Sequence, residues 1–146
     1  MSKIIRSAQI WHSVEAMFDI VDDVEHYPDF LPWCTGSEII SCDYKTMIAQ
    51  LTISYGSLKY SFTTRNVRSK PDRIDLFLVD GPFRKFEGYW KFSPITPSSS
   101  EVTLTLDFAF SNWLVSASIG RIFSVAAETM VDAFVERACL LHPEEN

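Results

Sequence analysis

The side chains that could perform nucleophilic or acid–base chemistry in this chain are few. Three cysteines and three histidines are present: Cys34, Cys42, Cys139, His12, His26 and His142. A cysteine nucleophile needs a base beside it, so a catalytic Cys34 would require one of these histidines as its neighbour. The cysteine spacing matches no metal-binding pattern. We favour free thiols and no metal site, with a nucleophilic Cys34 as the alternative.

His26 and Asp29 form the other candidate pair, because residues three apart can meet on one helical turn. They lie in the segment HYPDFLPWC, residues 26–34, whose two prolines exclude a long helix. A surface or capping role is the commoner fate of such side chains. We therefore expect no catalytic residue and no enzymatic activity.

The segment LVDGPFRKFEGYWKF, residues 78–92, carries the clearest pattern for binding. An Asp-Gly-Pro turn joins two runs that resemble strands. Phe86, Gly88, Trp90 and Phe92 then fall at alternate positions, which places them on one face of a strand. An aromatic face interrupted by a glycine suits a sheet that curves around something apolar.

The elements around this segment follow from hydrophobic periodicity. Residues 3–11 and most of the chain from Gly36 to residue 110 alternate with period two and are joined by connections of hairpin length, which predicts an antiparallel sheet. Pro94–Ser100 is expected to be a loose connection between two of these strands. Residues 14–23 have helical spacing after a possible N-cap at Ser13.

The period changes to 3.6 over residues 113–141. A polar stripe is formed by Arg121, Glu128, Asp132 and Glu136, and most other positions are apolar, so we predict one long helix. It needs a broad apolar surface, which the aromatic face of the sheet provides. The predicted fold is therefore a single α+β domain over residues 1–146. In this helix-grip architecture, a curved sheet of about seven strands surrounds a long C-terminal helix, with a short helical insert after the first strand and a cavity between sheet and helix.

The cavity is expected to have an aromatic wall that suits a lipid-type ligand. Its predicted members are Trp33, Tyr60, Phe62, Phe86, Trp90, Phe108, Phe110 and Phe123. Tyr60, Tyr89 and Arg84 are candidate donors to the oxygens of a head group. The alternative is that the aromatic residues only fill the core. Leu31, Pro32 and Trp33 form a predicted gate or membrane-touching tip, since Trp favours the membrane interface, unless Trp33 packs on the helix.

The charge is unevenly distributed in a chain of net charge −6. Residues 59–91 contain eight of the thirteen basic residues and four acidic ones, whereas residues 15–29 contain six acidic residues and neither Lys nor Arg. Lys59, Arg65, Lys85 and Lys91 are expected to face outward, either as a surface for a phosphate-bearing partner or as an ordinary solvated face. The N-terminal residues show no signal or transit pattern, and no charge-free run reaches the ~18–20 residues of a membrane span. We expect a cytoplasmic protein.

Three separated motifs resemble one known family. They are HSVEAMFDIVDDVEHYPDFLPWC near the N-terminus, DGPFRKFEGYWKF in the centre, and DFAFSNWL followed by an apolar helix that ends in AFVERA. Together they are similar to the family of coenzyme Q-binding (Coq10) proteins and ribosome association toxins (RatA), in the START-like, polyketide-cyclase-like superfamily. The resemblance covers nearly the whole chain, and the missing transit pattern favours the bacterial branch.

The resemblance implies a binding protein rather than an enzyme, with no required cofactor, and it offers two alternative functions. The first is a ubiquinone-binding lipid chaperone or carrier that supports respiration, with transient contact to the inner membrane. The second is a toxin that binds the large ribosomal subunit and blocks association of the subunits. The pI near 5.0 argues against broad electrostatic attachment to RNA. The predicted cavity favours the quinone-binding function, with ubiquinone or a related isoprenoid lipid as the ligand.

Overall fold

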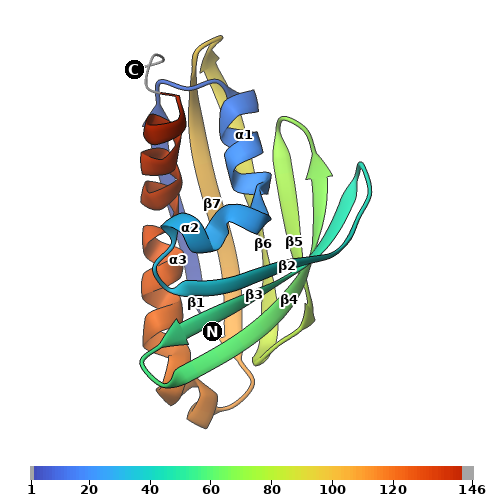
Figure 1. The fold of residues 1–146 in the computed structure, drawn as a ribbon, viewed down its shortest axis with the longest axis vertical. Coiled ribbons are helices and arrows are strands. Elements are labelled where there is room, and N and C mark those ends of the chain that lie inside the picture. Colours follow the sequence, from blue (N-terminus) through green and yellow to red (C-terminus); the bar gives the residue numbers. More distant parts are fainter. Residues whose placement is uncertain (1, 143–146) are drawn as a thin grey trace.

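A computed structural model of the chain describes residues 2–142. Seven antiparallel strands form one curved sheet in the order β1-β7-β6-β5-β4-β3-β2 (Figure 1). The strands are β1 (Ser2–Ile10), β2 (Cys34–Cys42), β3 (Thr46–Tyr55), β4 (Leu58–Ser69), β5 (Arg73–Asp80), β6 (Phe83–Thr96) and β7 (Ser99–Phe110). The helices are α1 (Val14–Asp22), the 3₁₀ turn η1 (Val24–His26), α2 (Tyr27–Phe30) and α3 (Trp113–Leu141). Because β1 and β2 lie at opposite edges, the helical insert between them must cross the sheet.

The helix α3 lies along the sheet (Figure 1), as the 3.6-residue period predicts. Its buried residues recur every three or four positions, from Ile119 and Phe123 to Phe134 and Ala138. The Asn112 side chain caps its start by accepting a hydrogen bond from the amide of Val115 at 3.0 Å. By length and composition alone α3 could also cross a membrane. A core helix passes the same test, and the apolar stripe of α3 packs on the sheet.

The expected element order and helix-grip architecture are confirmed, including both bounds of the long helix. Ser13 is the N-cap of α1, as predicted, and its hydroxyl accepts from the Ala16 amide at 3.2 Å. The expectation of a loose connection over Pro94–Ser100 is wrong. Strand pairing continues through Pro94↔Ser100 to Thr96↔Ser99, and a register shift between these pairs accommodates the proline.

The core divides into two hydrophobic clusters. One joins α1, η1 and α2 to the C-terminal half of α3 and the adjoining strands. The other is mainly aromatic and includes Phe62, Phe83, Phe86, Phe108 and Phe123. The half-buried side chains Trp33, Leu51 and Leu76 pack against both clusters. The boundary between the clusters is where the fold leaves space.

Candidate ligand-binding site

An apolar cavity lies between the inner face of the sheet and α3, at the boundary of the two clusters. Its volume is about 80 Å³. Most of its surface is aliphatic or aromatic, with contributions from η1, α2, six strands or their adjoining segments, and α3. The lining residues are Val24, Tyr27, Trp33, Ala49, Leu51, Ile53, Phe62, Thr64, Asn66, Leu76, Phe86, Trp90, Leu104, Leu106, Phe123, Ala126, Ala127 and Met130.

Five of the eight predicted wall residues line this cavity. They are Trp33, Phe62, Phe86, Trp90 and Phe123. Phe62, Phe86 and Trp90 reach it because side chains at alternate positions of β4 and β6 point to the inner face. Phe123 reaches it from α3, and its ring packs 6.0 Å from that of Phe62 and 6.2 Å from that of Phe86. Sheet and helix thus share one aromatic wall.

The other three predicted wall residues lie elsewhere. Phe108 and Phe110 pack behind Phe123, with ring centroids 4.9 and 5.9 Å from it, so they support the wall without lining it. On β7 the lining positions are Leu104 and Leu106, nearer the middle of the strand. The alternation along β7 shows which residues face inward, but it does not show how far along the strand the cavity extends.

Tyr60 is also absent from the cavity, although it lies on the strand that supplies Phe62. It is two residues from the start of β4 and half-buried, and its hydroxyl lies 3.0 Å from Oγ of Ser118 on α3. Tyr60 therefore ties the β3–β4 hairpin to the helix. The two other proposed head-group donors are misplaced as well. Tyr89 lies on the outer face beneath the Arg73 guanidinium, at 3.9 Å, and Arg84 is exposed.

Two polar residues that the sequence analysis overlooked do line the cavity. Thr64 and Asn66 are buried on β4, and the Thr64 hydroxyl donates to Oδ1 of Asn66 at 2.7 Å. In this orientation Nδ2 of Asn66 keeps two N–H donors without a protein acceptor in the described part of the chain. The alternation that places Phe62 inward extends to residues 64 and 66 and could have identified them. No charged side chain lines the cavity within residues 2–142.

The predicted gate is only partly at the surface. Leu31 is 1% exposed and belongs to the core, so it cannot touch a membrane in this conformation. Pro32 is exposed and Trp33 is half-buried, lining the cavity. The backbone carbonyl of Trp33 accepts a hydrogen bond from the Ser54 amide at 3.0 Å, which fixes this corner to β3. Trp33 is the member of the trio placed between cavity and surface.

The candidate catalytic groups are not arranged for catalysis. Cys34 is buried, and burial raises the pKa of its thiol, which is the opposite of what an activated nucleophile needs. Nδ1 of His26 lies 2.8 Å from the carboxylate of Asp23, and this hydrogen bond raises the pKa of the imidazole. The predicted partner, Asp29, is not bonded to it. The His26–Asp23 pair is exposed and lies outside the cavity.

The four basic residues of the predicted partner surface do not act as one free patch. Nζ of Lys85 lies 3.1 Å from the Asp107 carboxylate, and the Arg65 guanidinium lies over the Phe77 ring at 4.7 Å. In the strand register, Lys59 lies opposite Ser54 beside the β3–β4 turn, and Lys91 lies opposite Arg73 on β5 and Thr103 on β7. Two of the four, Lys85 and Arg65, are thus engaged by an acidic or an aromatic side chain of a neighbouring strand. A summed segment charge does not contain that information.

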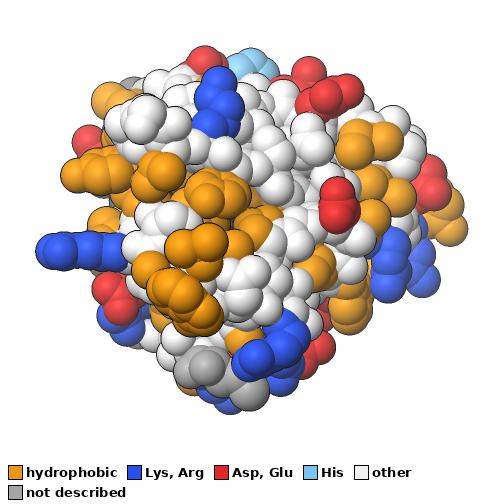
Figure 2. Space-filling view, turned by 90° about the horizontal axis from the view of Figure 1, so that it is seen from below, with side chains coloured by type: hydrophobic (Ala, Val, Ile, Leu, Met, Phe, Trp, Pro, Cys, Tyr) orange, Lys and Arg blue, Asp and Glu red, His pale blue; other side chains and the backbone are white. Residues whose placement is uncertain are grey.

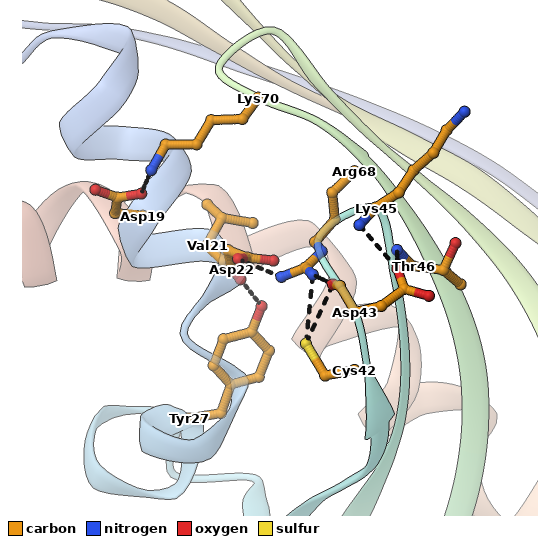
Figure 3. A network of polar contacts seen from close by, with 10 residues as sticks. All are labelled: Asp19, Val21, Asp22, Tyr27, Cys42, Asp43, Lys45, Thr46, Arg68 and Lys70. Carbon is orange, nitrogen blue, oxygen red and sulfur yellow. Dashed lines mark hydrogen bonds and ion pairs between the residues drawn. The ribbon is translucent and has the colours of Figure 1, made fainter.

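One buried cation fixes the helical insert to the sheet. Arg68 continues the inner face of β4 beyond Asn66, and Figure 3 shows it between α1 and the β2–β3 turn. Its Nη1 lies 3.0 Å from Asp22 of α1, and its Nη2 donates to the carbonyl of Asp43. Burial raises the pKa of the Asp22 carboxyl even though Arg68 acts in the opposite direction. Desolvation thus outweighs the attraction, so this carboxylate depends on its partner.

We expect Arg68→Met to lower the free energy of unfolding by about 3 kcal/mol at neutral pH, because Asp22 would remain partly buried without its cation. Lys70→Met is the matched control. Its ion pair with Asp19 is more than half exposed at both ends, so the loss should stay below ~1 kcal/mol. Urea unfolding measures both. Because the raised pKa makes the charged carboxylate the unfavourable state, the loss in Arg68→Met should shrink as the pH falls toward 3.8, the ordinary Asp value. Equal losses in the two variants would contradict the role of Arg68.

Residues 10–135 match the family described as polyketide cyclase / dehydrase and lipid transport. The chain belongs to this family. It is 42% identical over 139 residues to the ribosome association toxin RatA of Pseudomonas aeruginosa, covering 95% of this chain and 96% of that protein. It is 30% identical over 131 residues to the mitochondrial coenzyme Q-binding protein COQ10 homolog B of Xenopus laevis, covering 86% of this chain and 53% of that protein. The family resemblance drawn from the three motifs is confirmed.

The fold is shared with proteins of other functions. The aromatase/cyclase Zhui from Streptomyces sp. R1128 superimposes with a TM-score of 0.77 at 16% identity, covering 94% of this chain and 93% of that structure. Similarity at this level shows the START-like fold alone. The activity of that enzyme therefore carries no argument about catalysis here, and function has to be argued from the cavity and the surface.

Proposed function

We propose that this protein binds a neutral isoprenoid quinone, with ubiquinone as the leading candidate, and acts as its carrier or chaperone in the service of respiration. The observation that carries the proposal is the composition of the cavity wall. It is apolar and aromatic apart from Thr64 and Asn66, and no charged side chain lines it in the described residues. Such a wall disfavours a charged ligand, because desolvating its charge would be costly, and it supports a ring with a carbonyl oxygen and a hydrocarbon tail.

The dimensions of the cavity add a requirement to this proposal. Pockets that bury small ligands commonly have volumes of roughly 300–1,000 Å³, whereas the cavity here has about 80 Å³. A prenylated ring can enter only if side chains or α3 move outward. Each buried methylene contributes ~0.8 kcal/mol of binding free energy. Burial of one five-carbon isoprene unit would therefore offset ~3–4 kcal/mol of the free energy that this rearrangement costs. Trp33 and Met130 line the cavity and are only half-buried. We therefore expect these two side chains to move outward with little disturbance of the packed core.

Quinone binding can be measured through quenching of the fluorescence of Trp33 and Trp90. We expect the chain to bind a short-tailed ubiquinone analogue more tightly than an alkylbenzene of the same tail. Asn66→Leu should lose about tenfold in quinone affinity and nothing in alkylbenzene affinity, because one donor to the carbonyl is removed. Ser61→Leu, which has the same apolar side chain on an exposed position of β4, is the control. If neither compound binds and no lipid co-purifies with the protein, the quinone-binding proposal fails.

Ribosome association is the second candidate function. It is favoured by the 42% identity with the toxin RatA of Pseudomonas aeruginosa over nearly the full length of both chains. In that case the contact surface would be on the outside, and the cavity could remain empty. Co-sedimentation with large ribosomal subunits tests it, using the double charge reversal Lys59→Glu and Arg65→Glu. Retained co-sedimentation in this variant would show that these two side chains are not the contact.

A further inference from the structure

One end of the molecule combines exposed apolar side chains with two arginines that have no carboxylate partner among residues 2–142. Trp113 and Leu114 open α3 and are 79% and 62% exposed, and Tyr55 in the β3–β4 hairpin is 66% exposed. The hydrogen bond between Tyr60 and Ser118 holds the hairpin against the start of α3. Figure 2 looks onto this end and shows hydrophobic side chains gathered there, with both basic and acidic side chains at the margins. We call it the α3-start face, formed by Tyr55, Leu58, Arg84, Trp113, Leu114 and Arg121.

A surface groove of about 430 Å³ adjoins the α3-start face and shares Arg84, Trp113 and Arg121 with it. It is bordered by both Arg84 and Arg121, and Asn112, Trp113 and Ser116 contribute further polar and aromatic atoms. Both arginines are exposed, and neither has a carboxylate partner within residues 2–142. Most other arginines of the chain do have partners, for example Arg68 with Asp22 and Arg73 with Asp75. Two such guanidinium groups at one groove provide the fork-shaped donors that bind phosphate.

We propose that the α3-start face docks on a membrane surface that contains anionic phospholipid. Trp113 would lie at the level of the headgroups, where indole is favoured, and Leu114 and Leu58 would enter the acyl boundary. Arg84 and Arg121 would bind headgroup phosphates in the groove. Exposed aliphatic side chains beside the arginines favour a bilayer over RNA, because RNA offers no apolar phase for Leu114.

The distribution of charge supports this orientation. The acidic residues of α1, including Glu15 and Asp19, lie toward the opposite end of the molecule from the start of α3 (Figure 1). An anionic surface therefore repels the α1 end and attracts the α3-start face, although the chain as a whole carries a charge of −6. Asp80, at the end of β5, forms no ion pair with either arginine.

Docking at this face would bring the cavity close to the lipid. The groove residues Phe108 and Phe110 contact Phe123, whose other contacts include the cavity residues Phe62 and Phe86. One aromatic layer thus separates the groove from the cavity. The docking proposal stands without the quinone-binding proposal, because it rests on the surface alone. Its test uses vesicles that contain no quinone.

Flotation of the full chain with lipid vesicles tests the proposal. We expect binding to vesicles of phosphatidylcholine with phosphatidylglycerol, weaker binding to phosphatidylcholine alone, and release by salt. The double variant Arg84→Gln, Arg121→Gln should lose roughly 30-fold in partitioning to the anionic vesicles, at about fivefold for each residue. Lys45→Gln with Lys91→Gln is the control, since it removes the same charge from exposed lysines elsewhere. Trp113→Ser should weaken binding about tenfold, and Trp11→Ser, which changes an exposed Trp at the α1 end, should not.

Three results would overturn the proposal. The first is failure of the unmodified chain to float with anionic vesicles. The second is an equal loss in the test and control variants, which would indicate a non-specific charge effect. The third is a vesicle affinity unchanged by Arg84→Gln with Arg121→Gln while co-sedimentation with large ribosomal subunits is lost, which would make this face an RNA contact. Thermal melting of each variant shows whether it is folded, and these exposed substitutions should change the melting temperature by no more than ~2 °C.

Discussion

Gly88→Ala should lower the free energy of unfolding by about 3 kcal/mol and the melting temperature by about 10 °C. A methyl group at this position would lie 2.3 Å from the carbonyl oxygen of Thr105 and 3.0 Å from Cδ1 of Leu106. The first of these is a backbone atom of the neighbouring strand, so the clash can be relieved only by separating β6 from β7. Those two strands pair along their whole length inside the sheet, between β1 and β5.

The same substitution should also affect the ligand site. Gly88 pairs with Leu76 on one side and Leu106 on the other, and both leucines line the cavity. Gly36→Ala is the matched control on another strand, because its new methyl group would meet only Thr52, at the ordinary distances of 3.5 and 3.6 Å. Its expected effect is within ±0.5 kcal/mol. If urea unfolding shows the two variants to be equally stable, β6 and β7 do not approach as closely as described.

Ala126→Leu should make the ligand-free protein more stable against unfolding and should remove most of its affinity for quinone. Ala126 is 2% exposed on α3 and lines the cavity, so three added carbon atoms would occupy space that is now empty. Filling a cavity typically stabilises a protein by ~0.5–2 kcal/mol, and we expect a rise of about 3 °C in melting temperature. Quinone affinity should fall by roughly 100-fold, because the ring and the new side chain compete for one volume.

Val125→Leu is the control for this prediction, since the neighbouring Val125 is 47% exposed on the other side of α3. It should change neither quinone affinity nor stability appreciably. Melting curves and quinone titrations of the two variants provide the comparison. An Ala126→Leu protein that still binds quinone with unchanged affinity would place the ligand elsewhere. Ribosome co-sedimentation of the same variant then separates the two candidate functions, because an outer contact surface should tolerate a filled cavity.

Local patterns were sufficient for the architecture of this protein. The spacing of apolar residues shows which face of each element is buried: every second residue in the strands, and every 3.6 residues from Trp113 to Leu141. This spacing also distinguishes strand from helix, because each needs its own period to bury one face. The cap at Ser13 involves only neighbouring residues and was equally readable. The strand face that contains Phe62, Phe86 and Trp90 followed from the same alternation, so five of the eight predicted wall residues reach the cavity.

The sequence by itself therefore determined the elements, their inner faces and the family, whereas only the tertiary structure decided where along those faces the cavity lies. Phe108 and Phe110 lie on the inner face of β7, as predicted, but outside the cavity. At their end of the strand, Phe123 of α3 packs against both rings and leaves no space. The pairing of Lys85 with Asp107 likewise depends on a contact between residues distant in the chain, whereas the inward position of Thr64 and Asn66 follows from the alternation of β4. The period of a strand encodes which side it buries; the depth of a pocket and the partner of a charge arise only when separate elements pack together.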